Sequence, residues 1–132
     1  MAIDLLIVDD SPAMRSFITR VIELTGLDVG TCLHAGNGEE ALEVLARQTV
    51  DVVLTDINMP GMNGEEFVSR MAASETLRHI PIMVVSTDST LCRHERMTSL
   101  GVRGYLRKPF TPEALRLELV RVLSVQPEGS PQ

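Results

Sequence analysis

The sequence predicts an α/β protein built on a doubly wound, five-stranded parallel sheet with helices on both faces. Apolar runs of strand length alternate five times with segments that repeat apolar residues at helical spacing. This alternation is typical of parallel strands joined by right-handed helical crossovers. The length of 132 residues suits one domain of this class. We expect that domain to span residues 1–125, and the polar segment 126–132 to be a disordered tail.

The first strand is predicted at Ile3 to Val8, and a helix follows it directly. Ser11 has the side chain of an N-cap, and Pro12 suits the first helical position. The helix therefore starts just beyond the acidic pair Asp9 and Asp10. Its apolar residues at helical spacing, which we expect to be buried, are Met14, Phe17, Ile18, Val21 and Ile22.

Strand two is predicted at Val29 to His34 and strand three at Val50 to Thr55. The helix between them, Gly38 to Gln48, is expected to bury Ala41, Leu42 and Leu45. A turn-rich loop from Asn58 to Gly64 leads to helix three. Asn63 is expected to cap that helix, whose predicted buried stripe is Phe67, Val68 and Met71.

Strand four is predicted from Ile82 to Val85, ending in Ser86, and strand five from Gly104 to Arg107. The helix between them, about Thr90 to Leu100, has few apolar residues, and we expect it to be the loosest element. Helix five is predicted to start at Thr111 and to bury Leu115, Leu119, Val122 and Leu123.

The composition excludes several classes of protein. A hydrophobic share of 44% and a charged share of 23% are ordinary for a soluble globular protein, and the apolar runs are too short for membrane insertion. The amino terminus has no signal-peptide pattern, which favours the cytoplasm. Cys32 and Cys92 lack metal-type spacing and are expected to be free thiols there. The net charge of -6 disfavours direct binding of nucleic acid.

Three carboxylates stand where predicted strands end, because Asp9 and Asp10 follow strand one and Asp56 follows strand three. Ligands of doubly wound sheets bind beyond the carboxyl ends of the strands, so we expect these acids to converge. Crowded carboxylates repel one another unless a cation lies among them. The cluster therefore predicts a site for a hard divalent ion, Mg²⁺ foremost, with Mn²⁺ as a substitute.

A hydroxyl and an ammonium group are predicted at the same edge of the sheet. Ser86 ends strand four, and Lys108 ends strand five. A metal ion and a lysine neutralise phosphoryl oxygens, and a hydroxyl donates a hydrogen bond to one of them. Together with the carboxylate of Asp56, these groups predict a site for a phosphoryl group on an aspartate.

From Ile3 to about Val125 this pattern resembles the receiver domain of response regulators in two-component signalling, of the single-domain chemotaxis (CheY-like) type. The resemblance implies a flavodoxin-like fold with strand order 2-1-3-4-5. It implies that Asp56 accepts a phosphoryl group from the phosphohistidine of a histidine kinase or a phosphotransfer protein. The implied metal ligands, besides Asp56, are Asp10 directly, the backbone carbonyl of Asn58, and Asp9 mostly through water.

The resemblance also assigns roles on strands four and five. Ser86 becomes the hydroxyl that senses the phosphoryl group, and Lys108 the lysine that faces it, with a cis peptide bond after the lysine. We expect neither side chain to have a partner before phosphorylation. Tyr105 matches the receiver aromatic whose position follows that hydroxyl. Arg103, Tyr105 and Arg107 alternate along strand five and are expected on one side of it.

We expect this side of strand five to be the output surface for a downstream protein. Residues 89–125 carry seven basic and three acidic side chains, so the partner is expected to be acidic. The flanking helices are expected to contribute Arg93, Arg96, Arg116 and Arg121. The alternative is a merely solvated, arginine-rich face.

The resemblance implies a switch that dephosphorylates itself, and not an enzyme. Asn58 and Asp88 are small polar side chains that resemble those of fast-hydrolysing chemotaxis receivers, so we expect a short-lived phosphoryl group. Thr87 is a departure, because many receivers have alanine or glycine there, and its bulk is expected to slow the entry of water. The unphosphorylated chain is expected to be a monomer.

Two other function classes use related folds. A Mg²⁺-dependent phosphatase of the haloacid-dehalogenase type also has an aspartate nucleophile, but it carries Asp-x-Asp on one strand. Here Asp9 is followed by Asp10 and Ser11, and Asp56 belongs to another strand. A flavodoxin-like flavin binder needs hydroxyls and amides for the flavin phosphate, whereas the loop from Asp9 to Ala13 is acidic. The phosphatase is the alternative to the receiver.

Overall fold

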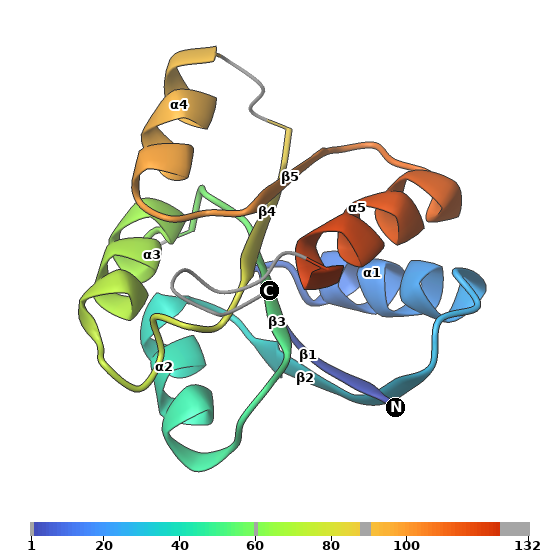
Figure 1. Cartoon of the computed structure of the whole chain (residues 1–132), viewed down its shortest axis with the longest axis horizontal. Coiled ribbons are helices and arrows are strands. Elements are labelled where there is room, and N and C mark those ends of the chain that lie inside the picture. The colour runs from blue at the N-terminus through green and yellow to red at the C-terminus, as the bar shows by residue number, and fades with distance from the viewer. Residues whose placement is uncertain (1, 60, 88–90, 125–132) are drawn as a thin grey trace.

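The structure is a computed structural model that describes residues 2–59, 61–87 and 91–124 (Figure 1). The predicted tail lies outside the described residues, so the division into domain and tail stays a prediction. Strands and helices alternate along the chain as predicted: β1 (Ile3–Val8), α1 (Pro12–Leu24), β2 (Val29–Ala35), α2 (Gly38–Arg47), β3 (Val52–Thr55), α3 (Gly64–Ala73), β4 (Ile82–Ser86), α4 (Leu91–Ser99), β5 (Gly104–Arg107) and α5 (Pro112–Ser124).

The strands form one five-stranded parallel sheet in the order β2-β1-β3-β4-β5. This is the predicted flavodoxin-like order, in which the direction of winding reverses between β1 and β3. At that point Val8 pairs with Ala35 on one side and with Thr55 on the other. The residues that follow these partners, Asp9 and Asp56, therefore leave the sheet at the same level.

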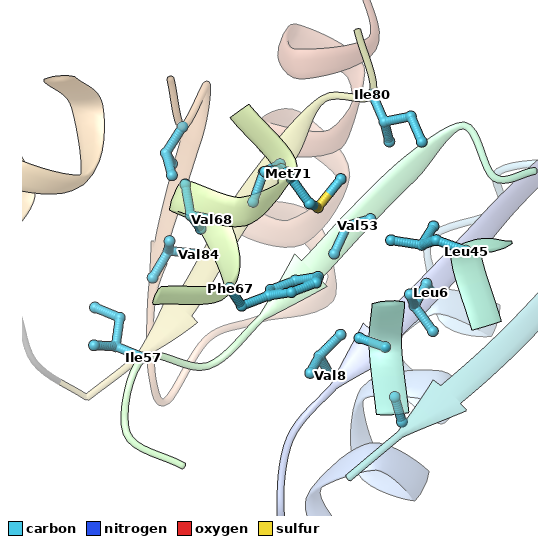
Figure 2. Close-up of a cluster of buried hydrophobic side chains, with 14 of the residues drawn as sticks. Leu6, Val8, Leu45, Val53, Ile57, Phe67, Val68, Met71, Ile80 and Val84 are labelled. Atoms are coloured by element: carbon cyan, nitrogen blue, oxygen red, sulfur yellow. The ribbon is translucent and has the colours of Figure 1, made fainter. Parts of the chain in front are cut away.

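Helices cover both faces of the sheet: α1 and α5 lie on one face, and α2, α3 and α4 lie on the other (Figure 1). Alternate residues of β1 point to opposite faces, so Leu6 and Val8 join one core and Leu5 and Ile7 the other. Figure 2 shows the core beneath α2 and α3, where Phe67 is fully buried. The buried stripe predicted for α3 is confirmed: Phe67, Val68 and Met71.

The helix caps follow the predicted side chains. The Oγ of Ser11 accepts the backbone N–H of Met14 at 3.1 Å, and the Oδ1 of Asn63 accepts that of Glu66 at 2.9 Å. These bonds satisfy backbone N–H groups that the first turn of a helix leaves without a partner. They fix the starts of the two helices that follow the acidic strand ends.

The prediction that Phe17 is buried is wrong, because its side chain is 46% exposed. The face of α1 that meets the sheet consists of Ile18, Val21 and Ile22. Phe17 lies on the flank of that stripe, where its ring contacts the ring of Phe110 at a centroid distance of 5.9 Å. A helical apolar pattern is wider than the stripe that one sheet can cover, so its edge stays in solvent.

Several predicted boundaries shift by one or two residues. β3 begins at Val52 and not at Val50, because its pairing with β1 starts at Leu5 and Val52. α4 runs from Leu91 to Ser99, and the predicted start at Thr90 lies outside the described residues. Among the α4 side chains that the structure describes, residues 94–99, the buried one is Met97, which is 0% exposed.

Two findings concern membrane-spanning helices and the cysteines. No helix in the ranges that the structure describes combines the length and apolar character needed to cross a membrane. Cys32 is a free thiol, and the side chain of Cys92 lies outside the described part of the chain.

Candidate functional site

Three carboxylates converge beyond the carboxyl ends of β1 and β3. Asp9, Asp10 and Asp56 each offer one oxygen, and these oxygens lie within 4.8 Å of one another. Asp9 is buried, Asp56 is half-buried and Asp10 is exposed. The acids thus meet where the strand order predicts, in the crevice at which the winding of the sheet reverses.

The backbone holds this arrangement by extending the ladders by one residue. Asp9 donates its N–H to the carbonyl of Ala35 at 3.1 Å, and Asp56 donates its N–H to the carbonyl of Val8 at 2.9 Å. Gly64, at the start of α3, donates its N–H to the carbonyl of Ile57 at 2.7 Å. A Cβ on Gly64 would overlap the carbonyl oxygen of Asp56, so only glycine lets α3 begin this close to the acid.

Lys108 is the cation of the cluster. Its Nζ donates to the Oδ2 of Asp9 at 3.0 Å and lies 3.7 Å from the Oδ2 of Asp56. The side chains of Lys108, Asp9 and Asp56 are only 11%, 3% and 14% exposed. The prediction that Lys108 lacks a partner is therefore wrong, because an ammonium group among carboxylates pairs with them before any phosphoryl group arrives.

Ser86 lies directly beside Lys108. The backbone N–H of Lys108 donates to the carbonyl of Ser86 at 2.9 Å, and the serine is fully buried. Ser86 also has a partner, so the prediction that it has none is wrong as well. The peptide bond between Lys108 and Pro109 is cis, as the resemblance implied.

The carboxyl group of Asp56 is held in two directions. Its Oδ1 accepts the backbone N–H of Ile57 at 2.7 Å, and its Oδ2 faces Lys108. The pKa of Asp56 lies above its ordinary value, chiefly because the carboxyl group is partly buried, and the negative charge of Asp9 raises it further. Lys108 and the backbone N–H groups of Ile57 and Asn58 act in the opposite direction and lower it. The result is a partly accessible carboxylate with a fixed orientation and a cation at one oxygen, which suits a nucleophile.

The donor set fits a hard divalent cation. Three carboxylates face one ammonium group, so negative charge is in excess, and carboxylate oxygens are the ligands that Mg²⁺ and Mn²⁺ prefer. Asp10 has no hydrogen bond or ion pair within the described ranges and is free to bind an ion. Asn58, two residues after Asp56, is exposed, and the role of its carbonyl as a ligand stays a prediction.

The residues predicted for the output surface are only partly brought together. Tyr105 is half-buried, with its ring 4.8 Å from that of His94. Arg103 and Tyr105 line a cavity of about 280 Å³ together with Glu118 and other residues of α4 and α5. Arg107 is exposed and is not among the residues that line it.

Several arginines of the flanking helices are bonded to other parts of the chain and are not all available to a partner protein. Arg96 donates to Glu65 of α3 at 2.8 Å, and Arg116 donates to the carbonyl of Thr25, at the end of α1. Arg116 therefore belongs to the side of α5 that faces α1, and its predicted place around Tyr105 is wrong. Arg121 lines the cavity. The side chain of Arg93, like Asp88, lies outside the described residues.

Sequence reasoning missed three side chains near these sites: Arg15, His94 and Glu118. Arg15 donates to the backbone carbonyl of Asp9 at 2.5 Å, and its place one turn into the helix after the acids was the available signal. Glu118 accepts the backbone N–H of Tyr105 at 2.9 Å and also pairs with Arg121. The three-residue spacing of Glu118 and Arg121 was visible, whereas nothing in the sequence joins His94 to Tyr105.

Comparison with known proteins identifies the family. The model of the response regulator receiver domain matches residues 5–120. A chemotaxis protein CheY homolog of Campylobacter jejuni is 38% identical over 120 residues, which cover 90% of this chain and 91% of the relative. Chemotaxis protein CheY1 of Helicobacter pylori strain J99 is also 38% identical, with 90% of this chain and 95% of the relative covered.

Solved structures agree with the sequence relatives. The chemotaxis response regulator CheY4 of Vibrio cholerae superposes with a TM-score of 0.80 at 33% sequence identity, covering 92% of this chain and 99% of that one. The phosphatase alternative finds no support in these comparisons. The chain belongs to the response regulator receiver domain family, and its relatives are signalling switches of the CheY type.

Proposed function

We propose that this chain is a single-domain response regulator that accepts a phosphoryl group on Asp56 from the phosphohistidine of a histidine kinase or a phosphotransfer protein. The observation that carries the proposal is the position of Asp56, half-buried among two further acids and 3.7 Å from the Nζ of Lys108. The names of the relatives place them in chemotaxis, and we propose the same pathway here.

In the proposed reaction a carboxylate oxygen of Asp56 attacks the phosphorus atom of the donor. The new P–O bond forms as the P–N bond to the imidazole breaks, and the imidazole leaves with that electron pair. The negative charge on the transferred group is offset by Lys108, and the hydroxyl of Ser86 donates to one of its oxygens. Later attack by water on the phosphorus returns Asp56 and inorganic phosphate, which is the proposed self-dephosphorylation.

The acidic cluster supports a requirement for Mg²⁺ or Mn²⁺. We assign Asp10, Asp56 and the backbone carbonyl of Asn58 as direct ligands, with Asp9 acting through water. The lesser role of Asp9 is supported by its contacts, because its Oδ1 accepts the N–H of Ser11 at 2.9 Å and its Oδ2 accepts Lys108. When bound, the ion adds positive charge beside the incoming phosphoryl oxygens.

The signal is proposed to reach a downstream protein through β5 and the helices beside it. Lys108 is bonded to Asp9 before phosphorylation. Phosphorylation is therefore proposed to move Lys108 from one partner, Asp9, to another, the phosphoryl group. That exchange, together with a new bond to Ser86, is proposed to bias the surface around Tyr105, Arg103 and Arg107. The partner is proposed to present acidic groups, and the unphosphorylated chain to act as a monomer.

A small phosphodonor tests the central claim. The protein is incubated with acetyl phosphate and MgCl₂, and its intact mass is measured. We expect wild type to gain one phosphoryl group, and Asp56→Asn or added EDTA to prevent the gain. Asp28→Asn, which changes an exposed aspartate away from the cluster, is the matched control and should behave as wild type. A phosphoryl group that persists in Asp56→Asn would refute the assignment.

A further inference from the structure

Each of the four polar groups of Asp9 has a partner, and these partners come from three segments of the chain: the end of β2, the start of α1, and the residues after β5. Its backbone N–H donates to Ala35 at the end of β2. Its two carboxylate oxygens accept the N–H of Ser11 and the ammonium of Lys108. Its carbonyl oxygen accepts the Nη1 of Arg15 at 2.5 Å. Of these contacts, only the one from Arg15 comes from a side chain with no proposed role in phosphoryl transfer.

Arg15 completes a ladder that the sheet leaves unfinished. The last pair between β1 and β2 is Val8 with Ala35, after which the chain turns toward α2. Beyond that pair, no backbone N–H among the described residues donates to the carbonyl of Asp9. Side chains of a helix point back toward its amino terminus, so Arg15 of α1 reaches the carbonyl that lacks a strand partner.

Placing the guanidinium group of Arg15 at this position costs free energy. The Nε of Arg15 is buried and has no hydrogen-bond partner among the described residues. A buried donor without a partner costs free energy, so a group placed for stability alone would be a poor choice here. Among the described residues, the hydrogen bond of its guanidinium group goes to the Asp9 carbonyl, so this contact serves the acidic site.

The carbonyl of Asp9 belongs to the peptide group that leads to Asp10. That group is planar, so the direction of the Asp9 carbonyl also sets the backbone direction from which the Asp10 side chain departs. The carboxylate of Asp10 has no other partner in the described part of the chain to aim it. We propose that Arg15 is a positioning residue, which orients the Asp10 carboxylate toward a divalent cation by holding the Asp9 carbonyl. This inference rests on the proposed metal site.

The positive charge of Arg15 and its positioning contact have opposite effects on the affinity for a cation. A change in affinity on replacing Arg15 therefore shows which effect is larger. Near three carboxylates and Lys108, an additional positive charge repels an incoming cation. Removing the charge alone would therefore tighten metal binding. Loss of the positioning contact would weaken it, because groups that orient ligands typically contribute about tenfold or more to metal affinity.

The test uses Mn²⁺ as the probe, titrated into the full chain, with free Mn²⁺ measured by electron paramagnetic resonance. We expect Arg15→Met to bind Mn²⁺ about tenfold more weakly than wild type. Arg15→Lys, which keeps a donor and the charge, should recover most of the loss. Arg20→Met removes an exposed arginine of the same helix and should leave the affinity unchanged.

A readout in the metal-free protein separates positioning from general damage. The amide resonances of Asp9 and Asp10 should shift in Arg15→Met and stay in place in Arg20→Met, while the melting temperature remains near that of wild type. Unchanged or tighter Mn²⁺ binding by Arg15→Met would overturn the proposal, as would a loss that Arg15→Lys fails to recover. If Arg15→Met does not fold, Arg15→Gln takes its place, because its shorter side chain loses the charge and the reach to the Asp9 carbonyl. Weaker Mn²⁺ binding than wild type then supports the proposal, and equal or tighter binding overturns it. Wild type that binds no Mn²⁺ would instead overturn the proposed metal site.

Discussion

Replacing Asp10 by asparagine is expected to stabilise the metal-free protein while weakening its response to Mg²⁺. The three acids of the site have oxygens within 4.8 Å of one another, and Lys108 pairs with Asp9 and Asp56 but not with Asp10. Asp10 is therefore the least compensated charge of the cluster. Asn keeps the size of the side chain and removes the charge.

The expected gain follows from Coulomb's law. At 4.8 Å two like charges repel by about 0.9 kcal/mol in water and by about 3.5 kcal/mol at an effective dielectric constant near 20. Asp10 is exposed, so the value for water is the closer one. It is repelled by two carboxylates, and Lys108 offsets part of that. The net gain in the free energy of unfolding is about 1 kcal/mol, which corresponds to a rise of roughly 3–5 °C in melting temperature.

Urea unfolding followed by circular dichroism measures both effects. In EDTA at low ionic strength, Asp10→Asn should be more stable than wild type, and added salt should reduce the difference. In MgCl₂, wild type should gain stability through binding of the ion to the folded state, Asp10→Asn should gain little, and Asp9→Asn should lose less of the response than Asp10→Asn. Asp28→Asn is the control for an exposed charge outside the cluster. Equal stability of Asp10→Asn and wild type in EDTA, or an equal response to Mg²⁺, would refute the reasoning.

Three further predictions concern the phosphorylated protein. Ser86→Ala and Lys108→Ala should fold but lose the phosphorylation-dependent gain in binding to a downstream partner; a full gain in affinity, measured by calorimetry, would exclude the altered residue from the switch. Thr87 is exposed, and Thr87→Ala should speed the loss of the phosphoryl group, which is measured as the change of intact mass with time. A wild-type lifetime of hours would contradict the expected fast hydrolysis. Arg103→Glu and Arg107→Glu should weaken binding of an acidic partner and its dependence on salt. Affinity that neither change moves would place the output surface elsewhere.

The sequence predicted the fold and the meeting of the acids because both depend on patterns that are local. The apolar runs ending in Val8 and Thr55 read as buried parallel strands, and the strand ends of such a sheet share one edge. Asp9 and Asp56 follow those ends directly, so their proximity needs no knowledge of side-chain packing. The caps Ser11 and Asn63 were equally local.

Predictions failed where the partner of a side chain lies elsewhere in the chain. Phe17 has a hydrophobic side chain at helical spacing, but which edge of α1 stays in solvent depends on how the helix sits on the sheet. Arg96 and Arg116 were predicted from the charge of residues 89–125 to be available to a partner protein. Arg96 instead pairs with α3, and Arg116 bonds to the end of α1. The bond from Arg15 to the Asp9 carbonyl links a side chain to a backbone group, so the position of Arg15 one turn after the acids was its only signal in the sequence.

The ion pairs of Lys108 have a consequence for how fast the site can respond. An ammonium group already neutralises part of the charge on Asp9 and Asp56, so the two acids need not be forced together when a cation or a phosphodonor arrives. The site is in this sense preorganised, with its main rearrangement reduced to the rotation of one flexible lysine side chain. That rotation requires the two ion pairs of Lys108 to break, but it moves no helix or strand. We therefore expect encounter with the donor, and not assembly of the site, to limit the rate at which the signal is received.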